Sequence, residues 1–117
     1  MKINMKRYEI WMADLPTRKN SHVQAGCRPV IVVSNDVANA HSPVITVVPL
    51  TSRLAKNSLP THVHLREQGL PKDSLALCEQ IISLDKTRFI RYIGYIYRPF
   101  DRLALDHAIA VQLGMAA

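Results

Sequence analysis

The sequence is poor in cysteine, glycine and aromatic residues. Its 117 residues include two Cys, four Gly and 6% aromatic side chains. Cys27 and Cys78 lie far apart and belong to no CxxC or other zinc-binding spacing. We expect two reduced thiols beside apolar runs rather than a disulfide. Because the chain also offers no carboxylate cluster suited to magnesium, we expect no metal and no other cofactor.

Long hydrophobic runs are missing as well. No stretch approaches the ~20 apolar residues that a membrane span requires, and no apolar segment follows the basic residues 1–7. This pattern predicts a cytoplasmic protein without a membrane segment. The chain shows no repeats, no low-complexity tract and no domain boundary. Its length suits one modest core, so we expect a single domain spanning residues 1–117.

Acidic residues are fewer than basic ones. Fifteen Lys and Arg against nine Asp and Glu give a formal net charge of +6 at pH 7. An excess of this kind favours an anionic partner, nucleic acid first. The basic residues are spread along the chain rather than grouped, which indicates a folded surface and not a basic tail.

A short apolar run at residues 30–33 predicts a strand buried on both faces. Gly26 frees the backbone before it, and Pro29 suits the first residue of the strand. Arg28 then lies at the mouth of the strand, with a permanent charge at the edge of the core. Such a charge needs either a carboxylate partner or a bound anion, and the sequence leaves both open.

A second buried strand is expected at residues 44–48, and the segment Pro49-Leu50-Thr51-Ser52-Arg53 follows it. If the two strands are neighbours, Arg28, Thr51, Ser52 and Arg53 cluster at one edge. Planar guanidinium donors beside hydroxyl donors suit a phosphate group.

The remaining elements follow from local patterns. We expect strands at residues 8–13, 61–65, 74–84 and 91–97, one helical turn at 35–41, and a C-terminal helix that ends near Gly114. Asp101 is expected to cap that helix, with Phe100 and Leu105 forming a hydrophobic staple. Trp11 is expected to anchor the core rather than to stack on a ligand. Residues 15–27 form either a lid over an anion or an ordinary solvated connection.

Several polar residues carry open alternatives. Glu79 and Gln80 interrupt the apolar run of the expected strand 74–84. Glu79 needs a partner there, and Arg28 is one candidate. His62 and His64 fall on one face of their strand, where we expect a polar surface rather than a metal site.

Several motifs resemble those of one family, in family order. Arg7-Tyr8-Glu9-Ile10-Trp11 resembles the opening R-G-[DE]-[IV]-W of the MazF/PemK mRNA interferase toxins. Gln24-Ala25-Gly26-Cys27-Arg28-Pro29-Val30 is similar to the family pattern Q-x-G-x-R-P-V. The other similar segments are Ser34-Asn35-Asp36, Leu50-Thr51-Ser52-Arg53, Leu59-Pro60-Thr61-His62-Val63, Gly69-Leu70-Pro71-Lys72-Asp73-Ser74 and Glu79-Gln80-Ile81. The resemblance covers roughly residues 7–113, and it departs from the family at Tyr8, where Gly is usual, and at Cys27.

The resemblance implies a mainly β fold with short helices. It implies the small SH3-like barrel of the MazF, Kid and CcdB toxins, with a C-terminal helix and assembly as a homodimer. The implied activity is metal-independent, sequence-specific cleavage of single-stranded mRNA. In this reaction the 2′-hydroxyl attacks the adjacent phosphorus and leaves 2′,3′-cyclic phosphate and 5′-hydroxyl ends. A cognate antitoxin with a disordered acidic segment is the implied partner.

Arg28 and Thr51 carry over as the catalytic residues of the family. Arginine keeps its proton above pH ~12, so we assign Arg28 to stabilising negative charge and Thr51 to hydrogen bonding a phosphate oxygen. His22 and Glu79 are candidates for the general base. Lys19, Arg53 and Arg88 are candidate phosphate-binding residues, and Gln24, Ser52 and Gln80 are candidate base-reading residues, Gln80 alternatively being a core amide.

Two other functions remain open. A CcdB-like toxin that poisons DNA gyrase shares the fold, although it does not require Arg28 and Thr51 to converge. An RNA-binding barrel without chemistry is the other alternative. RNA incubated with the protein and EDTA distinguishes them, because only a metal-independent ribonuclease yields discrete fragments.

Overall fold

The computed structural model describes residues 4–54, 58–66, 69–70 and 72–117. These residues form one antiparallel sheet in the order β4-β5-β3-β2-β1-β7, with β6 also paired to β3. The strands are β1 (Glu9–Leu15), β2 (Gly26–Val32), β3 (Val44–Thr51), β4 (His62–Leu65), β5 (Ser74–Leu77), β6 (Ile82–Asp85) and β7 (Phe89–Tyr95). The helical elements are α1 (Asp36–His41), α2 (Pro99–Gln112) and the 3-10 turns η1 (Cys78–Gln80) and η2 (Lys86–Arg88).

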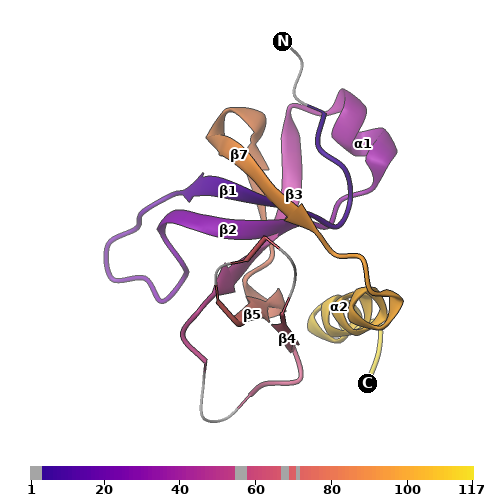
Figure 1. The fold of residues 1–117 in the computed structure, drawn as a ribbon. Helices are drawn as coiled ribbons and strands as arrows, with labels where there is room; N and C mark the ends of the chain where they lie inside the picture. Colours follow the sequence, from indigo (N-terminus) through magenta and orange to yellow (C-terminus); the bar gives the residue numbers. More distant parts are fainter. Residues whose placement is uncertain (1–3, 55–57, 67–68, 71) are drawn as a thin grey trace.

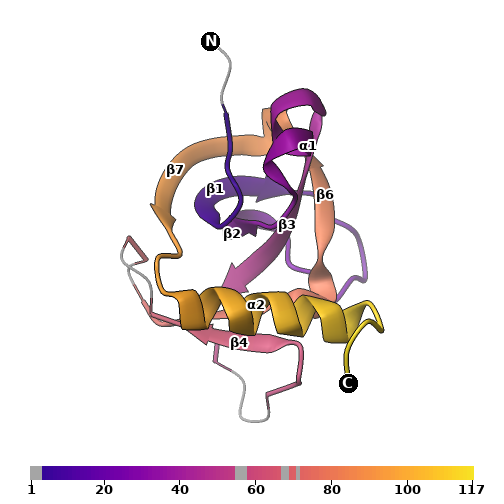
Figure 2. The same cartoon turned by 90° about the vertical axis from the view of Figure 1, so that its right-hand side faces the viewer.

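The sheet is strongly curved but open. Its end strands β4 and β7 lie far apart in the strand order, and within the described residues no pairing joins them. The helix α2 packs on β4 and η1, and Figure 2 shows it running alongside β4. Figure 1 shows the crossing of β1, β2 and β7 over β3, with α2 at one side of the molecule. The predicted mainly β fold with a C-terminal helix is therefore confirmed, and its barrel stays unclosed.

Both faces of the central strands are buried, as the apolar runs predicted. Neighbouring residues of one strand belong to two different core clusters, Ile31 to one and Val30 and Val32 to the other. Alternation along a strand sends successive side chains to opposite faces, so the curved sheet encloses one cluster on each. Trp11 is 9% exposed and contacts Phe89 edge to face, which confirms its place in the core.

Both prolines of the two central strands lie inside the strands, and not at their ends as expected. Pro29 is opposite Met12 of β1, and it precedes Val30, the first residue of β2 that pairs with β3. Pro49 falls in the interval between the pairings of β3 with β5 and with β6. Each proline therefore lies where one hydrogen-bonded ladder stops, which is a position at which a sheet tolerates a missing N–H.

The predicted long strand at residues 74–84 is wrong, because it breaks into β5, η1 and β6. Leu50 of β3 pairs with Ala76, whereas Val47 pairs with Ile82. An advance of three residues along β3 thus corresponds to six residues along the segment that contains β5 and β6. The three extra residues form η1. Since η1 contains Glu79 and Gln80, the break removes the two polar residues from an otherwise apolar ladder.

The start of α2 also differs from the expectation. Arg98 occupies the N-cap without a side-chain cap, Pro99 is the first helical residue, and Asp101 lies in the first turn. The fixed φ of proline favours a helix start at Pro99, and the Asp101 carboxylate there still complements the helix dipole. The predicted staple is absent because Phe100 is 80% exposed. The helical turn expected at residues 35–41 is present as α1, where the Asn35 side chain accepts the Ala38 N–H and caps the helix.

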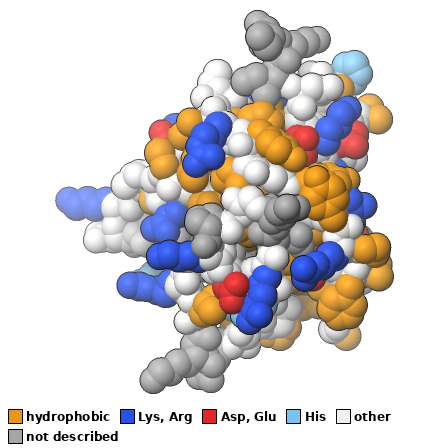
Figure 3. All heavy atoms as spheres, viewed as in Figure 1, with side chains coloured by type: hydrophobic (Ala, Val, Ile, Leu, Met, Phe, Trp, Pro, Cys, Tyr) orange, Lys and Arg blue, Asp and Glu red, His pale blue; other side chains and the backbone are white. Residues whose placement is uncertain are grey.

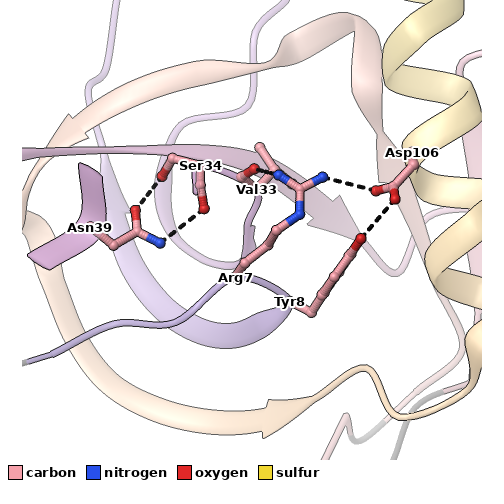
Figure 4. Close-up of polar contacts among 6 residues, drawn as sticks. All are labelled: Arg7, Tyr8, Val33, Ser34, Asn39 and Asp106. Atoms are coloured by element: carbon pink, nitrogen blue, oxygen red, sulfur yellow. Dashed lines mark hydrogen bonds and ion pairs between the residues drawn. The ribbon is translucent and has the colours of Figure 1, made fainter. Parts of the chain in front are cut away.

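A polar cluster joins the N-terminal segment to α2 (Figure 4). The Arg7 guanidinium pairs with Asp106 at 3.0 Å and also donates to the Val33 carbonyl, while the Tyr8 hydroxyl donates to Asp106 at 2.7 Å. Tyr8 has a φ of 73°, a conformation that favours glycine, and glycine is the usual family residue there. The Tyr8 ring contacts the Arg7 and Arg102 guanidiniums, so tyrosine compensates for its backbone strain through its side chain.

Membrane-spanning helices are not found among the described residues, since each helix there is too short or too polar to cross a bilayer.

Candidate active site

The strand register brings Arg28 and Thr51 together. Val30 of β2 pairs with Pro49 of β3 in an antiparallel ladder. Arg28 and Thr51 each lie two residues farther on, and a step of two keeps the same face of the sheet. The ladder itself stops at Val30 and Pro49, and beyond it Arg28 and Thr51 line the same two cavities. A guanidinium and a hydroxyl from two strands therefore meet there, as expected if the strands are neighbours.

Two cavities share this pair. One, of about 290 Å³, is lined by Arg28, Thr51 and Ser52 together with Met12, Cys27, Pro29, Leu50, Leu70, Lys72 and Ser74. The other, of about 310 Å³, is lined by Gln24, Arg28, Thr51, Ser52 and Arg53. The first cavity is mainly apolar and the second mainly polar. Arg28, Thr51 and Ser52 are common to both, so they form the boundary between two chemically different spaces.

The guanidinium of Arg28 has no acidic partner among the residues that the structure describes. Its Nε donates to the Ala25 carbonyl at 3.3 Å, and none of the ion pairs in that part of the chain includes it. Its remaining N–H groups are available to an anion. Of the two alternatives for this charge, the bound anion fits the geometry.

Glu79 is not the partner of Arg28. Its carboxylate accepts the Thr61 hydroxyl at 3.0 Å and contacts the His62 ring nitrogen Nε2 at 2.9 Å. The Leu59 N–H donates to Nδ1 of the same ring, so both ring nitrogens of His62 are engaged. His62 is accordingly buried while His64 is exposed, which corrects the expectation of a shared polar surface. Within the described residues no cluster of three or more His, Cys, Asp or Glu has the geometry of a metal site.

The Thr51 hydroxyl is held by its own turn. Its Oγ1 accepts the Arg53 N–H at 3.1 Å, and the residue is only 8% exposed. A hydroxyl has one proton to donate and two lone pairs, so this contact leaves the proton for another acceptor. Thr51 therefore both closes the turn and presents a fixed donor to the cavities.

The other predicted site residues divide into two groups. Gln24, Ser52 and Arg53 line the polar cavity beside Arg28. Lys19, Gln80, Arg88, His22 and Glu79 line neither cavity. Arg88 pairs with Asp14 at 3.4 Å, and the side-chain Oε1 of Gln80 accepts the Gln24 N–H at 2.7 Å. Neither candidate for the general base is thus placed beside Arg28 and Thr51.

Sequence reasoning missed Cys27, Leu70 and Lys72. Cys27 was expected beside the core, yet it is exposed and lines the apolar cavity, whereas Cys78 is fully buried. Burial raises the pKa of the Cys78 thiol to about 12. Leu70 follows Gly69, whose φ is +97° and where an added Cβ would lie 2.6 Å from the Ile93 carbonyl oxygen, so no side chain fits there. The Gly69-Leu70-Pro71-Lys72 segment was part of the family resemblance, and that was the available signal.

The surface around the cavities is basic. Figure 3 shows Lys and Arg side chains gathered mainly on the half of the molecule that carries the β1–β2 loop, with few acidic side chains among them. A positive surface of this kind attracts polyanions and concentrates them at the site. Fold and site together define a basic β-protein with a cavity lined by an arginine that has no acidic partner among the described residues.

Known proteins share this fold. The crystal structure of MazF from Deinococcus radiodurans superposes with a TM-score of 0.81 at 23% identity, covering 97% of this chain and 100% of that chain. An endoribonuclease from a mycobacterial species, solved in complex with its cognate antitoxin, gives 0.78 at 24% identity over 97% and 98% of the two chains. At these identities the similarity shows the fold.

Sequence comparison gives the family. Endoribonuclease MazF of Staphylococcus saprophyticus is 36% identical over 113 residues, which cover 95% of this chain and 92% of that protein. The family model described as "PemK-like, MazF-like toxin of type II toxin-antitoxin system" matches residues 6–110. The chain belongs to this toxin family.

Proposed function

We propose that this chain, an endoribonuclease toxin by family, cleaves single-stranded mRNA without a metal ion. The 2′-oxygen of the substrate attacks the adjacent phosphorus, the bond from phosphorus to the 5′-oxygen breaks, and 2′,3′-cyclic phosphate and 5′-hydroxyl ends form. The observation that carries the proposal is that Arg28 of β2 and Thr51 of β3 line the same two cavities, while among the described residues the guanidinium is bonded only to the Ala25 carbonyl.

Arg28 stabilises the charge that develops on the phosphorus oxygens. Its free N–H groups match two phosphate oxygens, and hydrogen bonds between charged groups are the stronger kind. Because guanidinium retains its proton at neutral pH, Arg28 acts as an electrostatic donor and not as the base. It is also suited to donate a proton to the leaving 5′-oxygen.

Thr51 fixes the position of the phosphate. Its oxygen is held by the Arg53 N–H, so its proton points to an acceptor in the cavities and contacts a non-bridging oxygen. Donors arranged before the reaction stabilise the transition state without reorganisation, and the loss of one typically costs on the order of 10²–10³ in rate.

The two cavities receive the nucleotides on either side of the cleaved bond. The apolar cavity with Leu70 and Lys72 accepts one base, and the polar cavity with Gln24, Ser52 and Arg53 reads the other. Bases enter such cavities only when they are unpaired and unstacked, which favours single-stranded RNA. Lys19 and Arg88, outside both cavities, contact phosphates farther along the strand.

A cognate antitoxin and a second copy of the chain are the proposed partners. An acidic disordered segment complements the basic surface and blocks RNA entry. A second copy would cover exposed apolar side chains, of which Tyr97, Phe100 and Leu103 lie on or next to α2. Its mRNA substrate would place the toxin in the cytoplasm.

The test is incubation of the purified protein with a long RNA in EDTA, with the 5′ ends of the fragments mapped. We expect discrete fragments with 5′-hydroxyl and 2′,3′-cyclic phosphate ends. Intact RNA would reject the nuclease and leave the gyrase-poisoning alternative. Binding without cleavage would leave the RNA-binding alternative.

A further inference from the structure

The loop between β1 and β2 is tethered by one side chain. Gln80 of η1 accepts the Gln24 N–H through Oε1 at 2.7 Å. Across the described part of the chain, no other hydrogen bond joins residues 16–25 to an element outside the β1–β2 hairpin. The loop packs over Pro49, Gln80 and Ile82 around a small cavity of about 60 Å³. The position of the loop therefore depends on the Gln80 amide.

The tether lies beside the carbonyl that holds Arg28. The tethered N–H belongs to Gln24, and the carbonyl of the next residue, Ala25, accepts the Arg28 Nε–H at 3.3 Å. Gly26 follows with a φ of +78°, where the chain turns into β2. A displacement of Gln24 moves the Ala25 carbonyl with it, because planar peptide units leave few soft dihedrals between them.

Gln80 itself is attached to a fixed platform. The Cys78 N–H donates to the Thr61 carbonyl at 3.0 Å, and Cys78 is fully buried. Glu79 binds both Thr61 and His62. The η1 turn is thus anchored on both sides, and the Gln80 side chain transmits its position to the loop.

We infer that Gln80 is a positioning residue for Arg28, acting through the Gln24 and Ala25 backbone rather than by contact with RNA. The inference rests on the proposed function. Holding a charged donor within a narrow range of positions lowers the barrier, and a displacement of about 1 Å can cost on the order of 10²-fold in rate. The tether holds the Gln24 backbone N–H and leaves its side chain free to contact a base, so we expect its loss to act mainly on kcat and little on KM.

The first experiment compares Gln80→Leu, Gln80→Glu and the surface control Gln112→Leu in steady-state cleavage of one mapped RNA. We expect Gln80→Leu to lower kcat by ~10- to 100-fold with KM changed less than about twofold. Gln80→Glu retains an acceptor oxygen and restores most of kcat. Gln112 lies on the exposed side of α2, so its variant matches wild type. A wild-type kcat for Gln80→Leu, or a loss confined to some RNA sequences, would overturn the inference and indicate a base-reading role.

The second experiment places Gln80→Leu in an Arg28→Lys background, which keeps the charge but removes Nε. If Gln80 acts through Arg28, the double variant cleaves at the rate of Arg28→Lys alone. Losses that multiply would show an independent role and contradict the inference.

The third experiment reads the position of Arg28 without cleavage. In the Gln80→Leu protein we expect the NMR signals of the Gln24 N–H and the Arg28 Nε–H to shift and exchange faster, with the melting temperature nearly unchanged. Unchanged signals would overturn the positioning role even if RNA is cleaved. If the wild type cleaves no RNA but these signals respond, the proposed function fails and the tether stands.

Discussion

Arg7 and Arg28 are both half-buried arginines beside apolar strands, and the fold treats them differently. The Arg7 guanidinium contacts Asp106, the Val33 carbonyl and the Tyr8 ring. Arg28 donates to one backbone carbonyl and, among the described residues, pairs with no carboxylate. Burial lowers the pKa of Arg7, but its contacts with Tyr8 and Asp106 outweigh burial and raise that pKa. The fold neutralises Arg7, and within the described residues it supplies no counter-charge to Arg28.

This difference separates stability from function. A matched pair such as Arg7 and Asp106 holds α2 against the N-terminal segment, whereas an unmatched charge raises the free energy of the folded state until an anion arrives. Active sites commonly give up stability in this way. The following predictions test this division, beginning with the largest effect.

Removal of either Arg28 or Thr51 should abolish cleavage and leave the stability of the fold intact. Arg28→Ala and Thr51→Ala should each lower the cleavage rate by at least ~10²- to 10³-fold, because each removes one transition-state donor. The melting temperature of Arg28→Ala should equal or exceed that of wild type. Single-turnover cleavage and thermal unfolding measure the two effects, and near-normal cleavage by either variant would remove that residue from the site.

Supplying Arg28 with a carboxylate should make it resemble Arg7. Ser52→Asp places an acid in both cavities, where it pairs with Arg28 and repels the phosphate. Cleavage should fall about tenfold or more, and the loss should shrink as salt screens the added charge. Ser52→Asn, which has the same shape without the charge, should lose far less. Equal losses for the two variants would show that size and not charge causes the effect.

Weakening the carboxylate partner of Arg7 should instead lower the stability of the fold and leave cleavage unchanged. Asp106→Asn weakens the acceptor of both Arg7 and Tyr8. The side chains of Arg7 and Asp106 are 33% and 39% exposed, so solvent screens their interaction in part. We expect a loss of about 1–2 kcal/mol in the free energy of unfolding, after allowance for solvent screening. Cleavage per folded molecule should stay at the wild-type rate. Denaturant titration and a cleavage assay at low temperature measure these quantities, and a large fall in kcat would contradict the division.

The smallest expected effect concerns the Tyr8 hydroxyl. Tyr8→Phe removes the bond to Asp106 but keeps the ring between the two guanidiniums, for a loss of about 1 kcal/mol. Burial raises the pKa of Tyr8 above its usual 10.0. A raised pKa means that stability is complete below pH 10 and is lost as pH rises through the folded-state value. Wild type should therefore lose more stability than Tyr8→Phe above pH ~10 in unfolding curves taken across pH.

The two central strands were predictable because their signals are local. Apolar runs at residues 30–33 and 44–48 predicted two buried strands but left open whether they are neighbours, and the pairing of Val30 with Pro49 answers that question. The partner of Arg7 was not predictable, since Asp106 lies 99 residues away and no local pattern links them. Lys72 comes from the segment before β5, where Gly69 lies against Ile93 of β7, and Cys27 comes from β2 itself.

The break at η1 escaped prediction for a different reason. Residues 74–84 read as one strand because apolar side chains continue on both sides of Glu79 and Gln80. The interruption is visible only in the register of β3 against two partners, which is a long-range property. The polar pair was nevertheless singled out as an interruption of the apolar run in which Glu79 needs a partner, and Thr61 and His62 are the partners that it has.

The length of η1 has a consequence for the strand that follows. Side chains of β6 alternate, with Leu84 turned to the core and Ser83 and Asp85 to solvent. Removing one residue from η1 would shift the alternation of β6 by one position, so that Leu84 would face solvent and an aspartate would face the core. Substitution in this turn is therefore far safer for the fold than a change in its residue count.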